Sequence, residues 1–143
     1  IAAEASVRVP ALCAVRSFPQ VHQMISTVEA TMRAGVSIGE GLRGCSPMAS
    51  MTGAPKGRAM ELIDAVEDVP RGLFSGTIGH VAPDGTALFN VVIRTLFFDA
   101  DTEQASLLSG GAITSLSRPE EEWAECELKA RSVIGALGHV LAD

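Results

Sequence analysis

The sequence predicts an α+β fold, in which an antiparallel β-sheet packs against helices. Two patterns favour this class. Apolar residues recur at helical spacing in residues 20–34 and 123–141, whereas residues 74–98 alternate in polarity around a turn at Pro83 and Gly85. The chain has 143 residues, of which 47% are apolar and 20% are charged, and this composition is typical of one globular domain.

The N-terminal half is predicted to hold three helices. The first covers residues 20–34, and Gly35 can cap its end. Its apolar positions are Val21, Met24, Ile25, Val28 and Met32. A shorter helix is expected over residues 38–44, followed by a loop over 46–54. The third helix should begin at Pro55, because the missing N–H of proline is harmless in a first turn, and it should end before Pro70.

The C-terminal half is predicted to hold the sheet and one long helix. Residues 74–82 and 88–98 form a β-hairpin, and residues 104–109 add a third antiparallel strand. Ser117 and Glu120 have the spacing of a capping box, which predicts the start of the last helix. The apolar face of that helix is Trp123, Ala130, Ile134, Leu137 and Leu141.

Charge and composition exclude several classes of function. The formal net charge is -6, and Lys and Arg form no cluster that could follow a phosphate backbone, so we expect no nucleic-acid partner. The apolar runs are shorter than the roughly 20 residues of a membrane helix, so we expect no membrane partner and a cytoplasmic location. Cys13, Cys45 and Cys126 have no nearby His at metal-ligand spacing, which favours reduced, structural thiols.

Three short segments could bind an anion. Arg94 lies in a predicted strand that is apolar on both faces, so it should either pair with a protein carboxylate or hold an acidic ligand. Gly110 and Gly111 end a strand where backbone N–H groups could approach a ligand, although glycines there are more often turn or bulge residues. Thr52 and Gly53 precede a helix N-terminus, which suits either anion binding or simple capping.

Three charged residues share one face of the last helix. Glu122, Glu125 and Lys129 are spaced i, i+3 and i+7, and Glu125 can pair with Lys129. A solvated charged face would explain this pattern. The alternative is a pair of carboxylates that bind a hard cation such as magnesium, with Glu61 of the third helix as a further carboxylate.

Residues 50–63 resemble the signature of chorismate-binding enzymes. The matching parts are residues 52–56, Thr-Gly-Ala-Pro-Lys, and residues 58–61, Arg-Ala-Met-Glu. The resemblance continues in order through residues 70–79, 92–95, 109–113 and 122–129. It implies the C-terminal part of the chorismate-utilising enzyme fold. We expect residues 1–143 to be this portion of a longer chorismate-binding domain whose N-terminal part is absent.

Members of this family act on chorismate with Mg2+, and the resemblance implies a metal site in this chain. Glu61 and Glu125 would ligate the magnesium ion, and Glu122 would act through a water molecule.

The resemblance also implies a set of substrate-binding residues. Arg94 would hold the enolpyruvyl carboxylate, and Lys129 would add positive charge. Thr52 and Gly53 would line the ring side of the substrate. Backbone N–H groups would hold a substrate carboxylate at Gly110, Gly111 and Ala112.

The chain departs from the family pattern at several positions. Gln23 stands at the usual position of a His, so Gln23 and Thr52 are the residues that the resemblance assigns to catalysis. His22 is one residue away, about 100° around the predicted helix. Phe74 replaces a frequent Tyr, and Ala112 replaces a frequent Gly, which narrows the approach of the backbone to a ligand.

Within the family, Thr52 favours the aminodeoxychorismate synthase branch. This branch converts chorismate to 4-amino-4-deoxychorismate, on the route to p-aminobenzoate and folate, with ammonia from a glutamine amidotransferase (glutaminase) partner. The first alternative is anthranilate synthase component I, where Ser is more frequent at this position. Relatives carry an upstream lysine nucleophile that this chain lacks. The second alternative is therefore a chain that folds or associates without turnover, and its exposed apolar surface should promote self-association.

Overall fold

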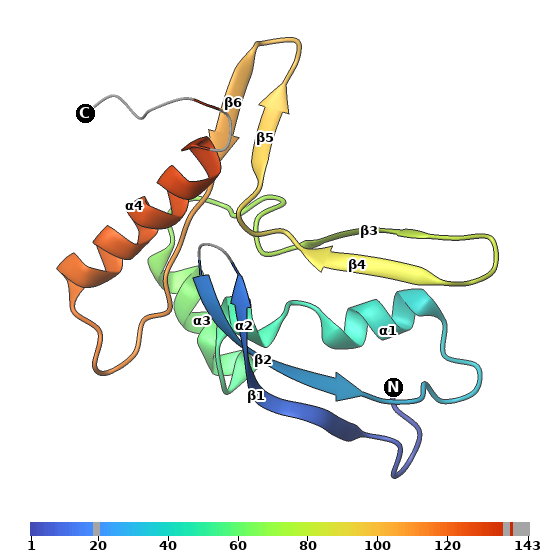
Figure 1. The fold of residues 1–143 in the computed structure, drawn as a ribbon. Coiled ribbons are helices and arrows are strands. Elements are labelled where there is room, and N and C mark those ends of the chain that lie inside the picture. The colour runs from blue at the N-terminus through green and yellow to red at the C-terminus, as the bar shows by residue number, and fades with distance from the viewer. Residues whose placement is uncertain (19–20, 136–137, 139–143) are drawn as a thin grey trace. The chain divides into compact units, whose positions relative to one another are not determined.

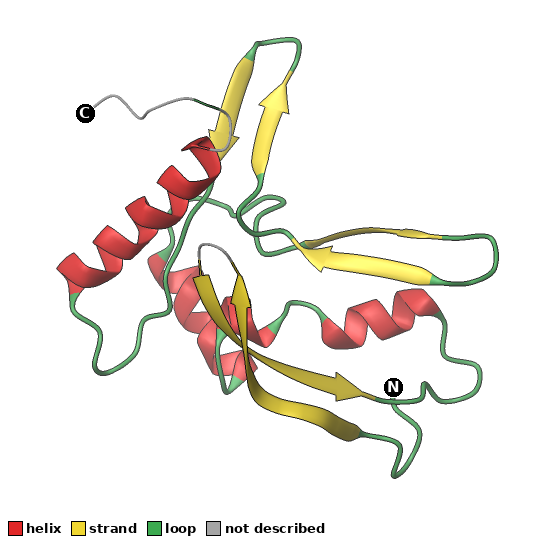
Figure 2. Cartoon of the chain, in the orientation of Figure 1, coloured by secondary structure: helices red, strands yellow, loops and turns green. Residues whose placement is uncertain are grey.

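A computed structural model describes residues 1–18, 21–135 and 138. Contacts within the chain define two compact units, Ile1–Ser46 and Pro47–Asp143. Each unit contains helices and antiparallel strands, so the predicted α+β class is confirmed (Figure 1, Figure 2). The prediction that residues 1–143 are one part of a single larger domain stays a prediction.

The first unit begins with a long β-hairpin. Strand β1 (Arg8–Phe18) pairs antiparallel with β2 (Val21–Glu29), so that Phe18 lies opposite Val21 beside the turn. At the open end Arg8 lies opposite Glu29, and Arg8 Nε donates to Glu29 Oε2 at 2.9 Å. An irregular register on both sides of Ala11 interrupts the ladder.

The predicted helix over residues 20–34 is wrong, because most of this segment is strand β2. The apolar spacing within it is compatible with a helix, but the strand is also rich in β-branched residues, which favour extended backbone. Pairing with β1 satisfies its backbone hydrogen-bonding groups, and a local pattern cannot reveal that partner. Gly35 does have a left-handed φ of 82°, but it lies in the turn before the next helix.

Helix α1 (Ile38–Cys45) lies where the sequence predicts a short helix. A capping box fixes its start, because Ser37 Oγ accepts from the Glu40 N–H at 3.2 Å and Glu40 Oε2 accepts from the Ser37 N–H at 2.8 Å. The Ser37 N–H is the main reason that the pKa of Glu40 lies below its usual value.

The second unit starts with two helices. Helix α2 (Ala49–Thr52) is a single turn within the segment predicted as a loop, so that part of the prediction is wrong. Helix α3 (Lys56–Val66) begins one residue after the predicted start at Pro55, and it ends before Pro70 as predicted.

Two separate hairpins follow these helices. Strand β3 (Thr77–Val81) pairs with β4 (Ala87–Val91), and β5 (Leu96–Asp99) pairs with β6 (Gln104–Leu107), both antiparallel. Only two-stranded sheets occur within the described ranges, so the predicted three-stranded sheet is wrong (Figure 2). The predicted strand 88–98 is interrupted after β4, and the backbone bends there before β5 begins.

An aspartate stabilises the turn of each of these hairpins. Asp84 Oδ1 accepts from the Thr86 N–H at 2.8 Å, and Asp99 Oδ1 accepts from the Asp101 N–H at 2.9 Å. Backbone N–H donors of this kind lower the pKa of Asp84 and of Asp99. The turn at Asp84 is the one that the sequence predicts at Pro83 and Gly85.

Helix α4 (Pro119–Gly135) starts two residues after Ser117, which the sequence predicts as its N-cap. The predicted capping box is wrong, because Ser117 Oγ accepts instead from the Thr114 N–H at 3.0 Å in the preceding loop. Proline in the first turn defines the start. Leu137 and Leu141, which the sequence assigns to the apolar face of this helix, lie outside the described residues.

Buried side chains are rare in the described part of the chain. They are Val92, 4% exposed, and Ser75, 9% exposed. Large apolar side chains are accessible in both units, such as Leu12 at 74% and Leu128 at 69%. These surfaces agree with the predicted self-association, which stays a prediction. Among the described residues, no helix combines the length and apolar character required to cross a membrane.

Candidate functional site

Two side-chain hydrogen bonds connect the loop after β6 to helix α4. Ser109 Oγ donates to the Cys126 carbonyl at 3.0 Å, and Lys129 Nζ donates to the Gly110 carbonyl at 3.0 Å. These hydrogen bonds hold the two glycines after the strand against one face of the helix. The sequence predicts both the loop and the helix, but not that they touch.

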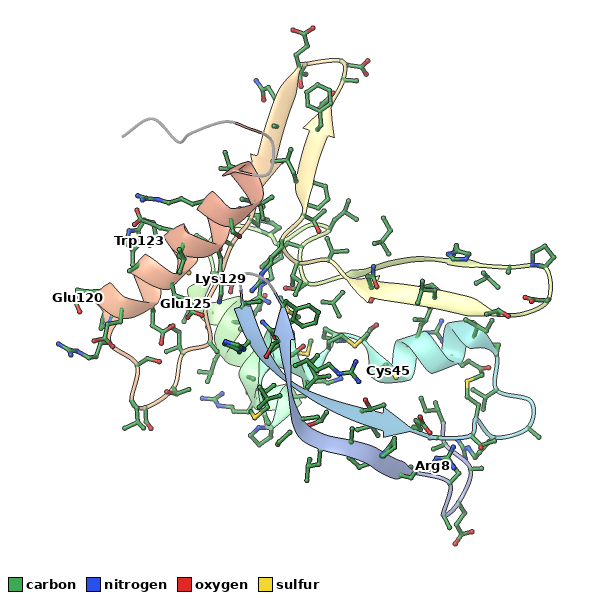
Figure 3. All side chains as sticks on the ribbon, viewed as in Figure 1. Arg8, Cys45, Glu120, Trp123, Glu125 and Lys129 are labelled. Carbon is green, nitrogen blue, oxygen red and sulfur yellow. The ribbon has the colours of Figure 1, made fainter. Side chains whose placement is uncertain are left out.

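The α4 face that meets this loop carries the predicted charged residues. Glu125 Oε1 and Lys129 Nζ form an ion pair of 3.0 Å, and Figure 3 shows both residues on one side of α4. The Lys129 side chain is only 29% exposed. Because Lys129 also binds the Gly110 carbonyl, this face is not the fully solvated surface that one interpretation of the sequence proposed.

Glu122 lies one turn earlier on the same helix and is not electrostatically satisfied. Its Oε2 atom is buried and has no hydrogen-bond partner among the described residues. An unsatisfied buried polar atom costs about 1–3 kcal/mol, and more when it is charged. A cation, or an N–H or O–H donor on a ligand, would remove this cost.

The missing side chain of Gly111 makes room for the two carboxylates. A Cβ atom on Gly111 would lie 2.8 Å from Glu122 Oε2 and 3.7 Å from Glu125 Oε2. Gly111 is not among the described residues with a left-handed φ, so a turn conformation does not explain the glycine. The close approach of the Glu122 carboxylate explains why this residue is a glycine.

A cavity of about 320 Å³ lies beside Glu122, and its walls are mostly apolar. Its size is near the lower end of the range for small-molecule pockets, which begins at about 300 Å³. The lining residues are Gly111, Ile113, Ser117, Pro119, Glu122, Trp123 and Cys126. A small ligand in this cavity would lie beside the Glu122 side chain.

The donor atoms at this site suit a hard cation in part. Carboxylate oxygens are the ligands that magnesium prefers, and Glu122 and Glu125 both face Gly111. Glu61 is not in this group, because its carboxylate accepts from Arg58 Nη1 at 2.8 Å and the pair is exposed. Within the described residues, no group of three or more acidic, His or Cys side chains is arranged so that it could hold a metal ion. Mg2+ ligation by Glu61 and Glu125 therefore stays a prediction.

Thr52 and Gly53 lie between α2 and α3. Thr52 Oγ1 donates to the Met48 carbonyl at 3.3 Å, and α3 has no side-chain cap at Pro55. Thr52 is therefore not the cap of α3, which was one of the two predicted alternatives. Gly53 has a φ of 121°, a backbone conformation that residues with a side chain rarely adopt.

Arg94 is placed differently from its prediction. It lies in the bend between β4 and β5, it is exposed, and its φ is 48°. The expected burial between two apolar faces is wrong, because the strand has already ended. Arg94 has no ion-pair partner among the described residues, so the predicted internal salt bridge is absent from this part of the chain.

Gln23 and Ala112 complete the predicted set. Gln23 lies on β2 opposite Arg16, in the first unit. Successive side chains of a strand point to opposite faces, so Gln23 and His22 are about 180° apart instead of the 100° expected for a helix. His22 Nδ1 lies 2.9 Å from Ser17 Oγ. Ala112 follows the glycine loop, and its carbonyl accepts from Ser117 Oγ at 3.4 Å.

Sequence reasoning missed Arg71, which is the most connected side chain near Thr52. Its guanidinium bonds to Glu67, to the Met51 carbonyl and to Ser75 Oγ. The i, i+4 spacing of Glu67 and Arg71 was a signal for the first of these contacts. The other two depend on the tertiary fold.

The fold and the paired carboxylates define an α+β protein with a candidate small-molecule site on its last helix. Residues 1–135 match the family described as chorismate binding enzyme, and the chain belongs to that family. This match confirms the resemblance that the signature at residues 50–63 implies.

Three similar proteins illustrate the match. The chain is 43% identical over 138 residues to the chloroplastic aminodeoxychorismate synthase of Arabidopsis thaliana, which covers 96% of this chain and 15% of that protein. It is 44% identical over 132 residues to the aminodeoxychorismate synthase of Streptomyces pristinaespiralis, covering 92% and 18%. The crystal structure of anthranilate synthase component I from Streptococcus pneumoniae superposes with a TM-score of 0.82 and 29% identity, covering 90% and 29%. The chain thus spans less than a fifth of these two curated relatives.

Proposed function

We propose that this chain carries the chorismate and magnesium site of an enzyme that makes 4-amino-4-deoxychorismate. One observation carries the proposal: the buried, unsatisfied oxygen of Glu122 faces Gly111, next to Glu125 and the Lys129 ammonium. The choice of reaction is supported by the 43% and 44% identity to aminodeoxychorismate synthases.

Glu122 and Glu125 would hold the magnesium ion, with Glu61 as a further carboxylate from α3. The bound ion would neutralise a carboxylate of chorismate and so favour its binding among protein carboxylates. The structural argument is one of charge: two carboxylates face one glycine, and within the described part of the chain only Glu125 has a cationic partner, Lys129.

The remaining residues would orient the acidic substrate. Backbone N–H groups of Gly110, Gly111 and Ala112 would donate to one substrate carboxylate, and Lys129 would add positive charge beside them. The exposed guanidinium of Arg94 would hold the enolpyruvyl carboxylate, which agrees with its lack of an ion-pair partner in the described residues. Thr52 and Gly53 would contact the ring.

Calorimetric titration of the chain with chorismate, with and without Mg2+, tests the proposal. We expect binding that requires Mg2+ and that is weakened by Glu125→Gln and by Glu61→Gln. Glu127→Gln is the matched control, because Glu127 is an exposed residue of the same helix that is two residues from Glu125. Binding that is indifferent to Mg2+ and to both substitutions would rule out the site.

The second candidate function is the reaction of anthranilate synthase component I. The TM-score of 0.82 to that protein from Streptococcus pneumoniae favours it. Incubation with chorismate, Mg2+ and ammonium, followed by chromatography, distinguishes the two products, 4-amino-4-deoxychorismate and anthranilate. The aminodeoxychorismate synthase of Streptomyces pristinaespiralis serves as a positive control.

A glutaminase partner would supply the ammonia for the reaction. Replacing ammonium with a glutaminase subunit and glutamine in the same incubation tests that partner, and product with ammonium but none with glutaminase and glutamine would contradict it.

A further inference from the structure

Arg71 connects three segments of the second unit through one guanidinium group. Nε donates to Glu67 Oε2 at 2.7 Å, and Nη2 bonds to the other oxygen of the same carboxylate. Nη1 donates to the Met51 carbonyl at 2.8 Å and to Ser75 Oγ at 3.0 Å. The three acceptors lie in α2, just after the end of α3 and in the segment before β3.

This ion pair differs from the other arginine pairs among the described residues. The Arg71 side chain is 25% exposed, whereas Arg8, Arg58 and Arg118 are 66–76% exposed in their pairs. Exposed pairs contribute little, but a bidentate pair that is partly covered has a defined geometry. Because Glu67 occupies the fork of the guanidinium, Arg71 is not available to bind a substrate carboxylate itself.

Each acceptor of Arg71 Nη1 is connected to a residue of the proposed substrate site, either as its neighbour in sequence or through a backbone hydrogen bond. Met51 immediately precedes Thr52, so its carbonyl fixes the end of α2. Ser75 is buried and has a left-handed φ of 69°, which is strained for a residue with a side chain. The Ser75 N–H donates to the Val92 carbonyl at 3.0 Å, and Val92 lies two residues before Arg94.

We propose that Arg71 is a positioning residue, which fixes the Thr52 segment and the Arg94 bend in the arrangement that chorismate requires. This inference rests on the proposed function. The guanidinium is needed because its planar fork can bind a carboxylate with one edge and two further acceptors with the remaining N–H groups. A lysine ammonium at this position cannot reproduce that geometry.

The test compares Arg71→Ala, Arg71→Lys and wild type by calorimetric titration with chorismate in the presence of Mg2+. We expect both variants to lose roughly tenfold or more in affinity, because displacing groups that position a ligand by about 1 Å has effects of this size. Millimolar methylguanidinium should restore binding to Arg71→Ala and have no effect on Arg71→Lys, in which the side chain still fills the site.

Two control variants separate positioning from general stability. Arg8→Gln breaks an exposed arginine–glutamate pair in the first unit, and Leu107→Ala removes a half-buried side chain from β6. Leu107→Ala should lower the melting temperature and keep chorismate affinity, while Arg8→Gln should change neither. If Arg71→Ala follows the Leu107→Ala pattern, Arg71 has only a structural role and the inference fails.

A second measurement locates the effect within the chain. Hydrogen exchange should become faster in Arg71→Ala at residues 50–53 and at residues 92–95, two segments far from position 71 in sequence, and methylguanidinium should slow it again. Unchanged exchange at both segments overturns the inference even when chorismate binding falls. If the wild type binds no chorismate, the proposed function fails and the positioning role fails with it.

Discussion

Replacing Gly111 with Ala tests whether the glycine exists to admit the Glu122 carboxylate. The new methyl group would start 2.8 Å from Glu122 Oε2, and an ordinary contact begins at 3.4 Å, so the oxygen must withdraw by about 0.6 Å. The oxygen is the far end of a flexible side chain and has no described hydrogen-bond partner to lose. It should therefore move, and the backbone should stay in place.

The consequences for stability and for binding have opposite signs. An Ala residue at a backbone conformation that it tolerates raises the free energy of unfolding by about 0.4–1 kcal/mol. Moving Glu122 Oε2 towards water recovers part of the ~1–3 kcal/mol that its unsatisfied burial costs. The affinity for the metal ion should fall roughly tenfold, or about 1.4 kcal/mol. The reason is that the displaced Glu122 carboxylate no longer lies next to Glu125 at residue 111, where the two would bind the ion together.

Gly110→Ala is the matched control, because its methyl group would meet only Phe74 Cζ at 3.9 Å. Urea unfolding followed by circular dichroism measures stability. Trp123, the only tryptophan of the chain, lines the cavity beside Glu122 and can sensitise the luminescence of bound Tb3+, a hard cation like Mg2+. A Gly111→Ala chain that loses more than about 1 kcal/mol of stability, or that binds Tb3+ as the wild type does, refutes this reasoning.

Three further predictions concern other parts of the chain. Arg94→Gln should change stability by less than about 0.5 kcal/mol, because Arg94 is exposed, yet weaken chorismate binding about tenfold by calorimetry; unchanged affinity would remove Arg94 from the site. Ser37→Ala should lower the free energy of unfolding by about 1 kcal/mol in urea, since it removes the α1 cap, and no loss would contradict the capping box. The Arg71 hydrogen bonds lower the pKa of Glu67, so their contribution to stability is present above pH 4.5 and is lost as the pH falls through the folded-state pKa. Arg71→Gln should flatten that part of the acid-unfolding curve, and identical curves would disprove the linkage.

The elements that the sequence predicts well are those whose start is encoded by adjacent residues. Helix α1 has its capping box at Ser37 and Glu40, and α3 follows a proline. The turn at Asp84 is stabilised by that residue's own carboxylate, two positions from its partner. In each case both interacting groups lie within one turn of chain, so a local pattern contains the whole interaction.

The elements that the sequence predicts wrongly depend on partners far along the chain. Strand β2 is extended because β1 pairs with it, and the apolar spacing in residues 21–32 contains no information about β1. The strand through Arg94 ends early because the regular β3–β4 ladder stops at Val92. The Val92 N–H still donates to Gly76, the next position of the register, but the Val92 carbonyl accepts from Ser75. Periodicity describes which face of an element is apolar, but it does not show where a neighbouring segment ends the element.

The candidate site divides in the same way. The Glu125–Lys129 pair follows from i, i+4 spacing, and the structure contains it. The unsatisfied Glu122 oxygen does not follow from residue spacing, because its burial results from the approach of Gly111, eleven residues earlier in the sequence. The resemblance assigned Glu122 only an indirect role through water, whereas its position makes it the carboxylate with the greatest need for a cation.

The division of the chain into two units bears on the replacement of the family's His by Gln23. The glycine loop, the α4 carboxylates, Lys129 and Arg94 all belong to Pro47–Asp143, and Gln23 belongs to Ile1–Ser46. Every group assigned to holding an anion or a cation therefore lies in one unit, together with the Arg71 contacts that fix two of its segments. A neutral amide at position 23 removes a titratable group from the catalytic set, but it takes no charge away from the groups that bind the substrate. The departure at Gln23 is thus compatible with a chain that has kept its chorismate site, and its effect should fall on proton transfer during turnover.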